Sequence, residues 1–153
     1  MKIYTLEREQ LLPISIEAAW EFFCDPHNLA KITPESMNFT VLSDVPQCMH
    51  PGMVVLYHVY PLGRFPFQWV TEITHVQEPY FFVDEQRFGP YKFWHHQHHF
   101  TPVAGGVKMT DLIHYVLPMG IIGRMLHYGV VQHKLNAIFS YRYAELERHF
   151  GTM

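Results

Sequence analysis

The chain has 153 residues, the usual size of one domain, and we expect residues 1–153 to form a single domain. Hydrophobic residues make up 48% of it and aromatic residues 16%, whereas charged residues account for only 16%. The formal net charge is −3 and Lys and Arg form no run, which excludes the clustered basic face of nucleic-acid-binding proteins. We therefore expect no nucleic-acid partner, and the aromatic excess predicts an internal lining in addition to a core.

The cysteine pattern and the apolar stretches bear on cellular location. Cys24 and Cys48 form no Cys-x-x-Cys pattern, and residues 1–9 alternate polar and apolar types instead of forming a signal peptide. We therefore predict a cytoplasmic protein with free thiols. Residues 116–131 are the most apolar stretch, but an arginine and a histidine interrupt them and they are shorter than the ~20 apolar residues of a bilayer span. We expect no membrane span.

The N-terminal region predicts one strand followed by two short helices. Residues 2–12 alternate as a strand does and end at a proline, after which Ser15 is a suitable N-cap for a short amphipathic helix. A second short helix begins at Pro26. It should end before Thr33-Pro34, because a residue that precedes proline is disfavoured in the helical region.

Beyond these helices the pattern changes to β-branched and aromatic runs separated by Gly and Pro turn signals. Six strands are predicted, and the links between them are short enough for antiparallel neighbours. Their expected spans are about 37–45, 52–61, 66–77, 80–88, 91–101 and 107–117.

After Pro118 and Gly120 the apolar spacing becomes helical, with a break expected near Gly129. A long terminal helix laid across a twisted seven-stranded sheet would give an α+β domain with a cavity between the two. The periodic row comprises Ile122, Met125, Val131, Leu135, Ile138, Phe139, Arg142, Leu146 and Phe150, and the solvated face carries Lys134, Arg142, Glu145, Glu147 and Arg148, with Arg142 assigned to both.

The predicted strand 91–101 carries the most distinctive pattern of the chain. Side chains alternate across a strand, so two imidazoles and two aromatic groups share one face, which is the composition of a binding wall. The other face should meet solvent. The inward set is Trp94, His96, His98 and Phe100, and the outward set is His95, Gln97 and His99.

The inward histidines have two candidate roles. Buried polar groups are normally paired, so His96 and His98 can be neutral cavity lining that is hydrogen-bonded to neighbouring polar groups or water. Alternatively, one of them is a general acid/base that Asp111 orients. The register decides whether Asp111 can do so. Pairing Pro102 with Val107 places Asp111 opposite His98, whereas a slip of one residue points it away. As cavity lining, His96 and His98 would be hydrogen-bonded to Asp111, Gln86, Tyr115 or water.

Metal binding is a further alternative for the same pair. His96 and His98 should lie roughly 6.5 to 7 Å apart along the strand, a separation compatible with two ligands on one metal. A third ligand would have to be Asp84, Glu72 or Asp111, each of which depends on register. We expect no metal and no cofactor, with His96 and His98 as the candidates if one is bound.

The neighbouring strand adds two polar candidates. Asp84 and Gln86 share one face of it, where they either reach the same space or cap the Gly89-Pro90 turn. No Gly-x-Ser-x-Gly or phosphate-binding loop occurs, which excludes the enzyme classes that these motifs characterise. The expected ligand-binding residues are Trp69, Asp84, Gln86, Trp94, His96, His98, Phe100, Tyr115, Met125 and Leu135.

Several motifs spread over nearly the whole chain match those of a known family. They are Leu29-Ala30-Lys31-Ile32-Thr33-Pro34, Phe82-Val83-Asp84-Glu85-Gln86, Gly89-Pro90-Tyr91, Trp94-x-His96-x-His98-x-Phe100, Asp111-x-x-x-Tyr115-x-x-Pro118-x-Gly120 and Phe139-x-Tyr141-Arg142. These motifs resemble the SRPBCC (START-related) superfamily, and within it the small bacterial proteins labelled polyketide cyclase/dehydrase-like or cell-division-inhibitor-like. The resemblance implies a helix-grip fold, in which a curved seven-stranded antiparallel sheet wraps around a long C-terminal helix and two short helices separate strands 1 and 2.

For function we expect a binding protein for a small hydrophobic molecule, of lipid, polyketide-like or aromatic type, held between sheet and terminal helix. One alternative is a cofactor-independent cyclase or hydratase that uses His96 or His98 with Asp111. Another is a regulatory module that docks on a second protein. We expect a monomer or a weak dimer.

Overall fold

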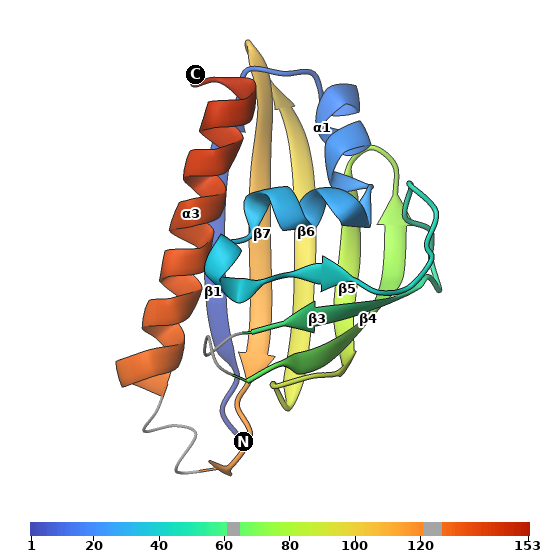
Figure 1. Cartoon of the computed structure of the whole chain (residues 1–153). Coiled ribbons are helices and arrows are strands. Elements are labelled where there is room, and N and C mark those ends of the chain that lie inside the picture. The colour runs from blue at the N-terminus through green and yellow to red at the C-terminus, as the bar shows by residue number, and fades with distance from the viewer. Residues whose placement is uncertain (61–64, 121–126) are drawn as a thin grey trace.

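Strands and helices follow one another in the computed structural model in almost the expected order (Figure 1). The structure describes residues 1–60, 65–120 and 127–153. The strands are β1 (Tyr4–Leu12), β2 (Thr40–Val41), β3 (Val54–Val59), β4 (Phe67–Gln77), β5 (Phe81–Phe88), β6 (Phe93–Val103) and β7 (Gly106–Val116). The helices are α1 (Ile16–Phe23), the 3-10 helices η1 (Pro26–Ile32) and η2 (Glu35–Met37), the π-helical turn η3 (His127–Val131) and α3 (Gln132–Phe150).

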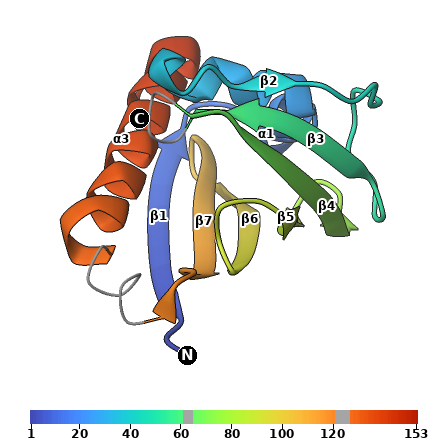
Figure 2. The same cartoon turned by 60° about the horizontal axis from the view of Figure 1, so that its bottom comes forward.

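Within the described residues, seven strands form one antiparallel sheet in the order β1-β7-β6-β5-β4-β3-β2. The first strand therefore pairs with the last, and the other neighbours are consecutive along the chain. Two register shifts in β4, at Val70/Thr71 and Ile73/His75, add to the ordinary strand twist. The sheet is consequently strongly curved, and α3 runs beside β1 along its concave side (Figure 2).

The short helices begin and end for the reasons that the sequence indicated. Ser15 Oγ accepts a hydrogen bond from the backbone N–H of Ala18 at 3.1 Å and so caps α1. The Asp25 side chain accepts one from the His27 N–H at 2.9 Å and caps η1. The two predicted short helices are therefore confirmed, the second as a 3-10 helix.

The expected strand at residues 37–45 is largely wrong. Met37 ends η2, and Asn38 follows with a left-handed backbone at φ 41°, so a strand can start only after it. Beyond Val41 the Ser43 hydroxyl accepts the Leu56 N–H at 2.9 Å, in place of a backbone carbonyl of a longer strand. β2 is therefore only two residues long.

The terminal helix packs a narrow row of side chains onto the sheet. Leu135 and Phe139 pack with Tyr4, Trp94 and Ile113, and Leu146 packs further along with residues of α1 and β7. The irregularity expected near Gly129 is the π-helical turn η3. Two predicted members of the row, Ile122 and Met125, lie outside the described residues. None of the helices in the described ranges is long and apolar enough to cross a membrane.

Candidate functional site

β6 has the two-faced character that its sequence predicts. Trp94, His96, His98 and Phe100 are all buried, whereas the residues between them are half-buried. The outer residues nevertheless have protein partners. His95 Nδ1 lies 2.7 Å from Glu85 Oε1, and Gln97 Oε1 accepts a hydrogen bond from His99 Nε2 at 2.9 Å. The outer face is thus a hydrogen-bonded polar surface.

A pocket of about 350 Å³ lies between the concave face of the sheet, η1 and α3. Its wall is mainly apolar and aromatic. Trp69 and Trp94 meet edge to face with ring centroids 5.4 Å apart, and Tyr91 lies 4.7 Å from Trp94. On the helix side, Leu135 and Phe139 pack with Trp94 and also line the pocket. The enclosure predicted between sheet and helix is therefore present as an open pocket.

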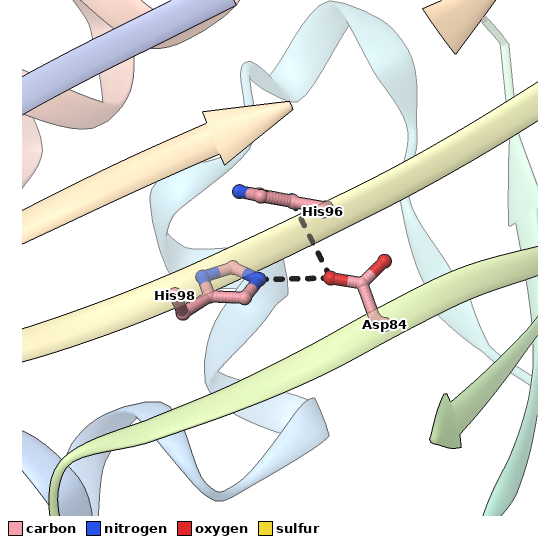
Figure 3. A group of neighbouring side chains, drawn as sticks. All are labelled: Asp84, His96 and His98. Atoms are coloured by element: carbon pink, nitrogen blue, oxygen red, sulfur yellow. Dashed lines mark hydrogen bonds and ion pairs between the residues drawn. The ribbon is translucent and has the colours of Figure 1, made fainter. Parts of the chain in front are cut away.

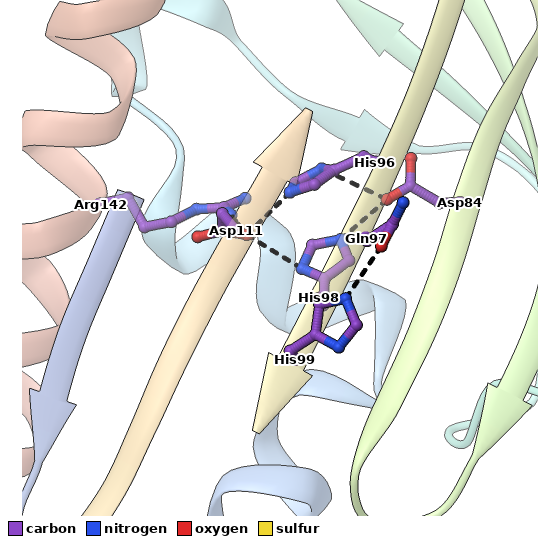
Figure 4. A network of polar contacts seen from close by, with 7 residues as sticks. All are labelled: Asp84, His96, Gln97, His98, His99, Asp111 and Arg142. Carbon is purple, nitrogen blue, oxygen red and sulfur yellow. Dashed lines mark hydrogen bonds and ion pairs between the residues drawn. The ribbon is translucent and has the colours of Figure 1, made fainter. Parts of the chain in front are cut away.

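Polar side chains from three strands and α3 meet at one part of this wall (Figure 4). Asp84 Oδ2 lies 2.8 Å from His98 Nε2 and 3.4 Å from His96 Nδ1 (Figure 3). Asp111 Oδ1 lies 2.7 Å from His96 Nε2 and 3.1 Å from His98 Nδ1. Arg142 Nη1 donates to the same Asp111 oxygen at 3.2 Å. We call these five residues the polar cluster.

Strand register places the four members of the polar cluster that lie on strands. His98 pairs with Asp111 between β6 and β7, and His96 pairs with Asp84 between β5 and β6. The first pairing confirms the alternative in which Pro102 lies opposite Val107. The two imidazole rings lie close together, with centroids 3.7 Å apart and planes tilted by 34°.

Burial and mutual contacts shift the pKa values of both carboxyl groups. Burial alone would raise the pKa of Asp111, but the charge of Arg142 and hydrogen bonds with the two imidazoles outweigh it and hold that pKa well below its usual range. Burial likewise opposes ionisation of Asp84, yet the charge of His96 and the hydrogen bond with His98 lower its pKa. Both aspartates are therefore carboxylates at neutral pH.

The two imidazoles shift in opposite directions. Burial and the neighbouring charge of His98 lower the pKa of His96. For His98, burial acts in the same direction, but hydrogen bonds to Asp111 and Asp84 outweigh it and raise the pKa. These directions favour a proton on His98 over one on His96. One imidazolium together with the Arg142 guanidinium would balance the two carboxylates.

The structure brings together most of the residues that the sequence placed at a ligand. Trp69, Asp84, Trp94, His96, His98 and Leu135 all line the pocket, whereas Met125 lies outside the described residues.

Three other expected ligand residues lie outside the pocket wall. Phe100 belongs to the core around Trp20, and Tyr115 stacks on Tyr4. Gln86 binds the turn that follows β5, donating to the carbonyl of Tyr91 at 2.6 Å and accepting from its N–H at 3.2 Å. It therefore occupies the turn-capping position that was its alternative role.

Arg142 is the functional residue that sequence reasoning did not single out. Its placement on the solvated face is wrong, because the residue is 7% exposed and lines the pocket. Its Nε has no hydrogen-bond partner among the described residues. Position 142 follows Phe139 by three residues and precedes Leu146 by four, so the apolar row itself was the signal.

Neither a protein-family model nor a curated protein matches the chain. Solved structures do match over almost its full length. Protein Ms6760 from Mycobacterium smegmatis is 19% identical, with a TM-score of 0.67, over 97% of this chain and 98% of that one. ZhuI aromatase/cyclase from Streptomyces sp. R1128 is 15% identical, with a TM-score of 0.70, over 96% and 95% of the two chains. Ara h 8.0201 is 13% identical, with a TM-score of 0.61, over 95% and 98%.

At these identities the likeness shows a shared fold. The seven-stranded curved sheet around a long C-terminal helix is the helix-grip architecture, which the resemblance to the SRPBCC superfamily implied. The fold predicted from the sequence is thereby confirmed. An aromatase/cyclase is among the proteins that share it.

Proposed function

We propose that the chain binds a small, largely apolar molecule in the pocket, with the polar end of that molecule at the polar cluster. The observation that carries the proposal is an apolar cavity of about 350 Å³ with buried ionisable side chains in its wall. A few polar groups within a mostly apolar lining are typical of small-molecule sites. The volume is at the lower end of the usual range of about 300 to 1,000 Å³, which favours a compact ligand.

The wall indicates which ligands are suitable. Each 100 Å² of apolar ligand surface that is buried contributes about 2.5 kcal/mol, which favours lipid-like, polyketide-like and aromatic molecules. The Asp84 side chain lines the pocket and is 18% exposed. A pure hydrocarbon would remove the exposed part of this carboxylate from water and add no hydrogen bond to the one with His98, at a cost in free energy. The ligand should therefore carry at least one hydrogen-bonding group.

A filling substitution tests the proposal. Ile138 is a half-buried pocket residue of α3, and Ala137 beside it is exposed. Ile138→Trp should place an indole in the cavity and lower the affinity for 1-anilinonaphthalene-8-sulfonate at least tenfold in a fluorescence titration. Ala137→Trp adds the same indole to the outside of the helix and should leave the affinity unchanged. Equal affinity in wild type and both variants would contradict the proposal.

A second candidate function is acid/base catalysis of a cyclisation with loss of water. The observation that favours it is a pair of adjoining imidazoles at an apolar pocket, with pKa values shifted in opposite directions, on a fold that an aromatase/cyclase shares. In the dehydration of the cyclised β-hydroxy ketone, neutral His96 would take the proton from the carbon next to the carbonyl and protonated His98 would give one to the hydroxyl, so that the C–H and C–O bonds break, a C=C bond forms and water leaves. The net proton count is then unchanged.

The test for this second function is turnover of a linear poly-β-ketone, followed by ultraviolet absorbance of the aromatic product. His98→Ala should abolish turnover while binding of 1-anilinonaphthalene-8-sulfonate persists. No turnover by the wild type with a panel of such substrates would remove this candidate and leave the binding function intact.

A further inference from the structure

The two aspartates of the polar cluster hold the imidazoles in the same way from opposite sides. One oxygen of Asp84 lies near both His96 Nδ1 and His98 Nε2, at 3.4 and 2.8 Å. One oxygen of Asp111 lies near both remaining ring nitrogens, at 2.7 and 3.1 Å. Each imidazole nitrogen therefore lies within 3.4 Å of a carboxylate oxygen (Figures 3 and 4). Two of these contacts are hydrogen bonds, His96 Nε2 with Asp111 and His98 Nε2 with Asp84, whereas His98 Nδ1 has no hydrogen-bond partner among the described residues.

One N–H on each ring is enough for the two hydrogen bonds, and only protons on both remaining nitrogens would add donors to the contacts at 3.4 and 3.1 Å. A neutral imidazole carries one N–H and an imidazolium two, so four donors would require both rings to be charged. Two imidazolium rings with centroids 3.7 Å apart, beside the Arg142 guanidinium, would repel strongly in a buried site. At least one ring nitrogen is therefore unprotonated and faces an anionic oxygen. His96 Nδ1 has the longest of the four distances and is the nitrogen best assigned to this state.

A metal ion can bind where nitrogen and oxygen lone pairs of several side chains converge in this way. One ligand atom from each of Asp84, His96 and His98 lies within 4.8 Å of the others. Bonds of about 2.0 to 2.2 Å to one metal place ligand atoms roughly 3 to 3.5 Å apart. The separations of 2.8 and 3.4 Å from Asp84 Oδ2 agree with this spacing.

The outer contacts also fit a metal centre. Histidine ligands usually donate their second ring N–H to a carboxylate, which orients the ring and strengthens the ligand. Asp111 lies at the second nitrogen of both rings, and Arg142 holds Asp111 in turn. Asp84, His96 and His98 line the pocket, so the unfilled coordination positions would face the ligand cavity.

We propose that Asp84, His96 and His98 bind one divalent first-row transition metal ion, such as Zn²⁺ or Fe²⁺, with Asp111 as the shared outer partner of both imidazoles. Two histidines and one carboxylate with open positions are an established ligand set for such ions. The proposal departs from our expectation, drawn from the sequence, that no metal is bound. It also goes beyond the proposed function, since it concerns the polar cluster without an organic ligand.

The experiment uses the full chain, treated with a chelator and then titrated with Co²⁺ alone. The wild type should bind one equivalent and develop visible d–d bands. His98→Gln and Asp84→Asn should each abolish those bands. The matched control is His95→Gln, which removes a histidine of the same strand that also contacts a carboxylate, Glu85, but on the other face. This control should bind Co²⁺ as the wild type does.

Asp111→Asn tests the outer partner separately. It should retain one equivalent of Co²⁺ and lower the affinity by about 10 to 100-fold, with the visible bands altered but present. A variant that acted only through stability would lower the unfolding temperature without changing the bands of the folded protein. Ile138→Trp should leave Co²⁺ binding intact, which separates failure of this proposal from failure of the pocket.

Two results would overturn the proposal. One is a wild-type spectrum that His98→Gln leaves unchanged, since the other histidines among the twelve would then be the ligands. The second result comes from the wild type and requires no variant. The X-ray absorption spectrum of the Zn²⁺-loaded wild type should show two imidazoles in the metal shell, and one or none would contradict the assignment even if the variants failed to fold.

Discussion

Arg142 of α3 contacts Asp111 of β7 beneath the pocket, with 3.2 Å between Nη1 and Oδ1, and both residues are more than 90% buried. The guanidinium also lies over the Phe139 ring, 5.0 Å from its centroid. This contact joins the terminal helix to the sheet through a charge pair. It also orients the carboxylate on which both imidazoles depend.

The first prediction concerns this contact. Arg142→Met should lower the free energy of unfolding by about 3 kcal/mol in urea, because it leaves a buried carboxylate short of a positive partner. The value is at the lower end for broken buried pairs because His96 and His98 still contact Asp111. Arg148→Met removes an exposed pair with Glu145 on the same helix and should cost less than about 1 kcal/mol. Equal losses in the two variants would contradict the structural role of Arg142.

The second prediction concerns Gln86, which contacts both backbone groups of Tyr91. Gln86→Ala should lower the free energy of unfolding by about 1 to 3 kcal/mol, because the partly buried turn loses its hydrogen bonds. Binding of 1-anilinonaphthalene-8-sulfonate per folded molecule should not change. Gln68→Ala, at an exposed position of β4, is the control and should alter neither quantity. A large loss of dye affinity in Gln86→Ala would instead return this residue to the ligand site.

A third prediction follows from the two thiols. Burial, followed by contact with Cys48, raises the pKa of the Cys24 thiol to about 12, so its reactive thiolate is scarce at pH 8. Cys48 is exposed. Iodoacetamide at pH 8 should therefore alkylate one thiol in the native protein and two after unfolding, as counted by mass spectrometry. Cys48→Ser should abolish the fast native reaction, and fast labelling of Cys24 in that variant would refute the assignment.

A fourth prediction concerns the cap of α1. Ser15→Ala should cost about 1 kcal/mol of unfolding free energy, because the Ala18 N–H loses its acceptor at the helix end. Ser140→Ala, at an exposed position within α3, should be neutral or slightly stabilising, since alanine is the better helix former. Thermal and urea unfolding of the two variants checks this. The idea fails if Ser15→Ala unfolds as the wild type does.

Sequence reasoning succeeded for features that depend on neighbouring residues and was incomplete for features that depend on contacts between distant segments. The faces of β6 follow from alternation alone. The sequence left two registers of β6 with β7 open, and the structure selects the one that places His98 opposite Asp111, with Gly105 in the tight turn at a φ of 84° that suits glycine. The order of elements follows from local turn and helix signals, whereas the helix-grip fold was implied by the resemblance to the SRPBCC superfamily.

The remainder of the site depends on contacts between distant segments. The connection after β5 is irregular, so the sequence did not determine that Asp84 pairs with His96 and reaches both imidazoles. Arg142 was assigned both to the apolar row and to the solvated face, because a cation on a helix is usually exposed, and only the carboxylate of Asp111, 31 positions away, explains its burial. The two-residue β2 likewise reflects a hydrogen bond that the Leu56 N–H donates to the Ser43 side chain, which no periodicity reveals.

The pocket as ligand site is the central claim, and nuclear Overhauser contacts of bound 1-anilinonaphthalene-8-sulfonate test it most directly. The dye protons should show contacts to the indole protons of Trp69 and Trp94, which face each other in the pocket wall. Contacts confined to exposed rings such as Phe65 and Phe88 would place the dye on the surface and contradict the account.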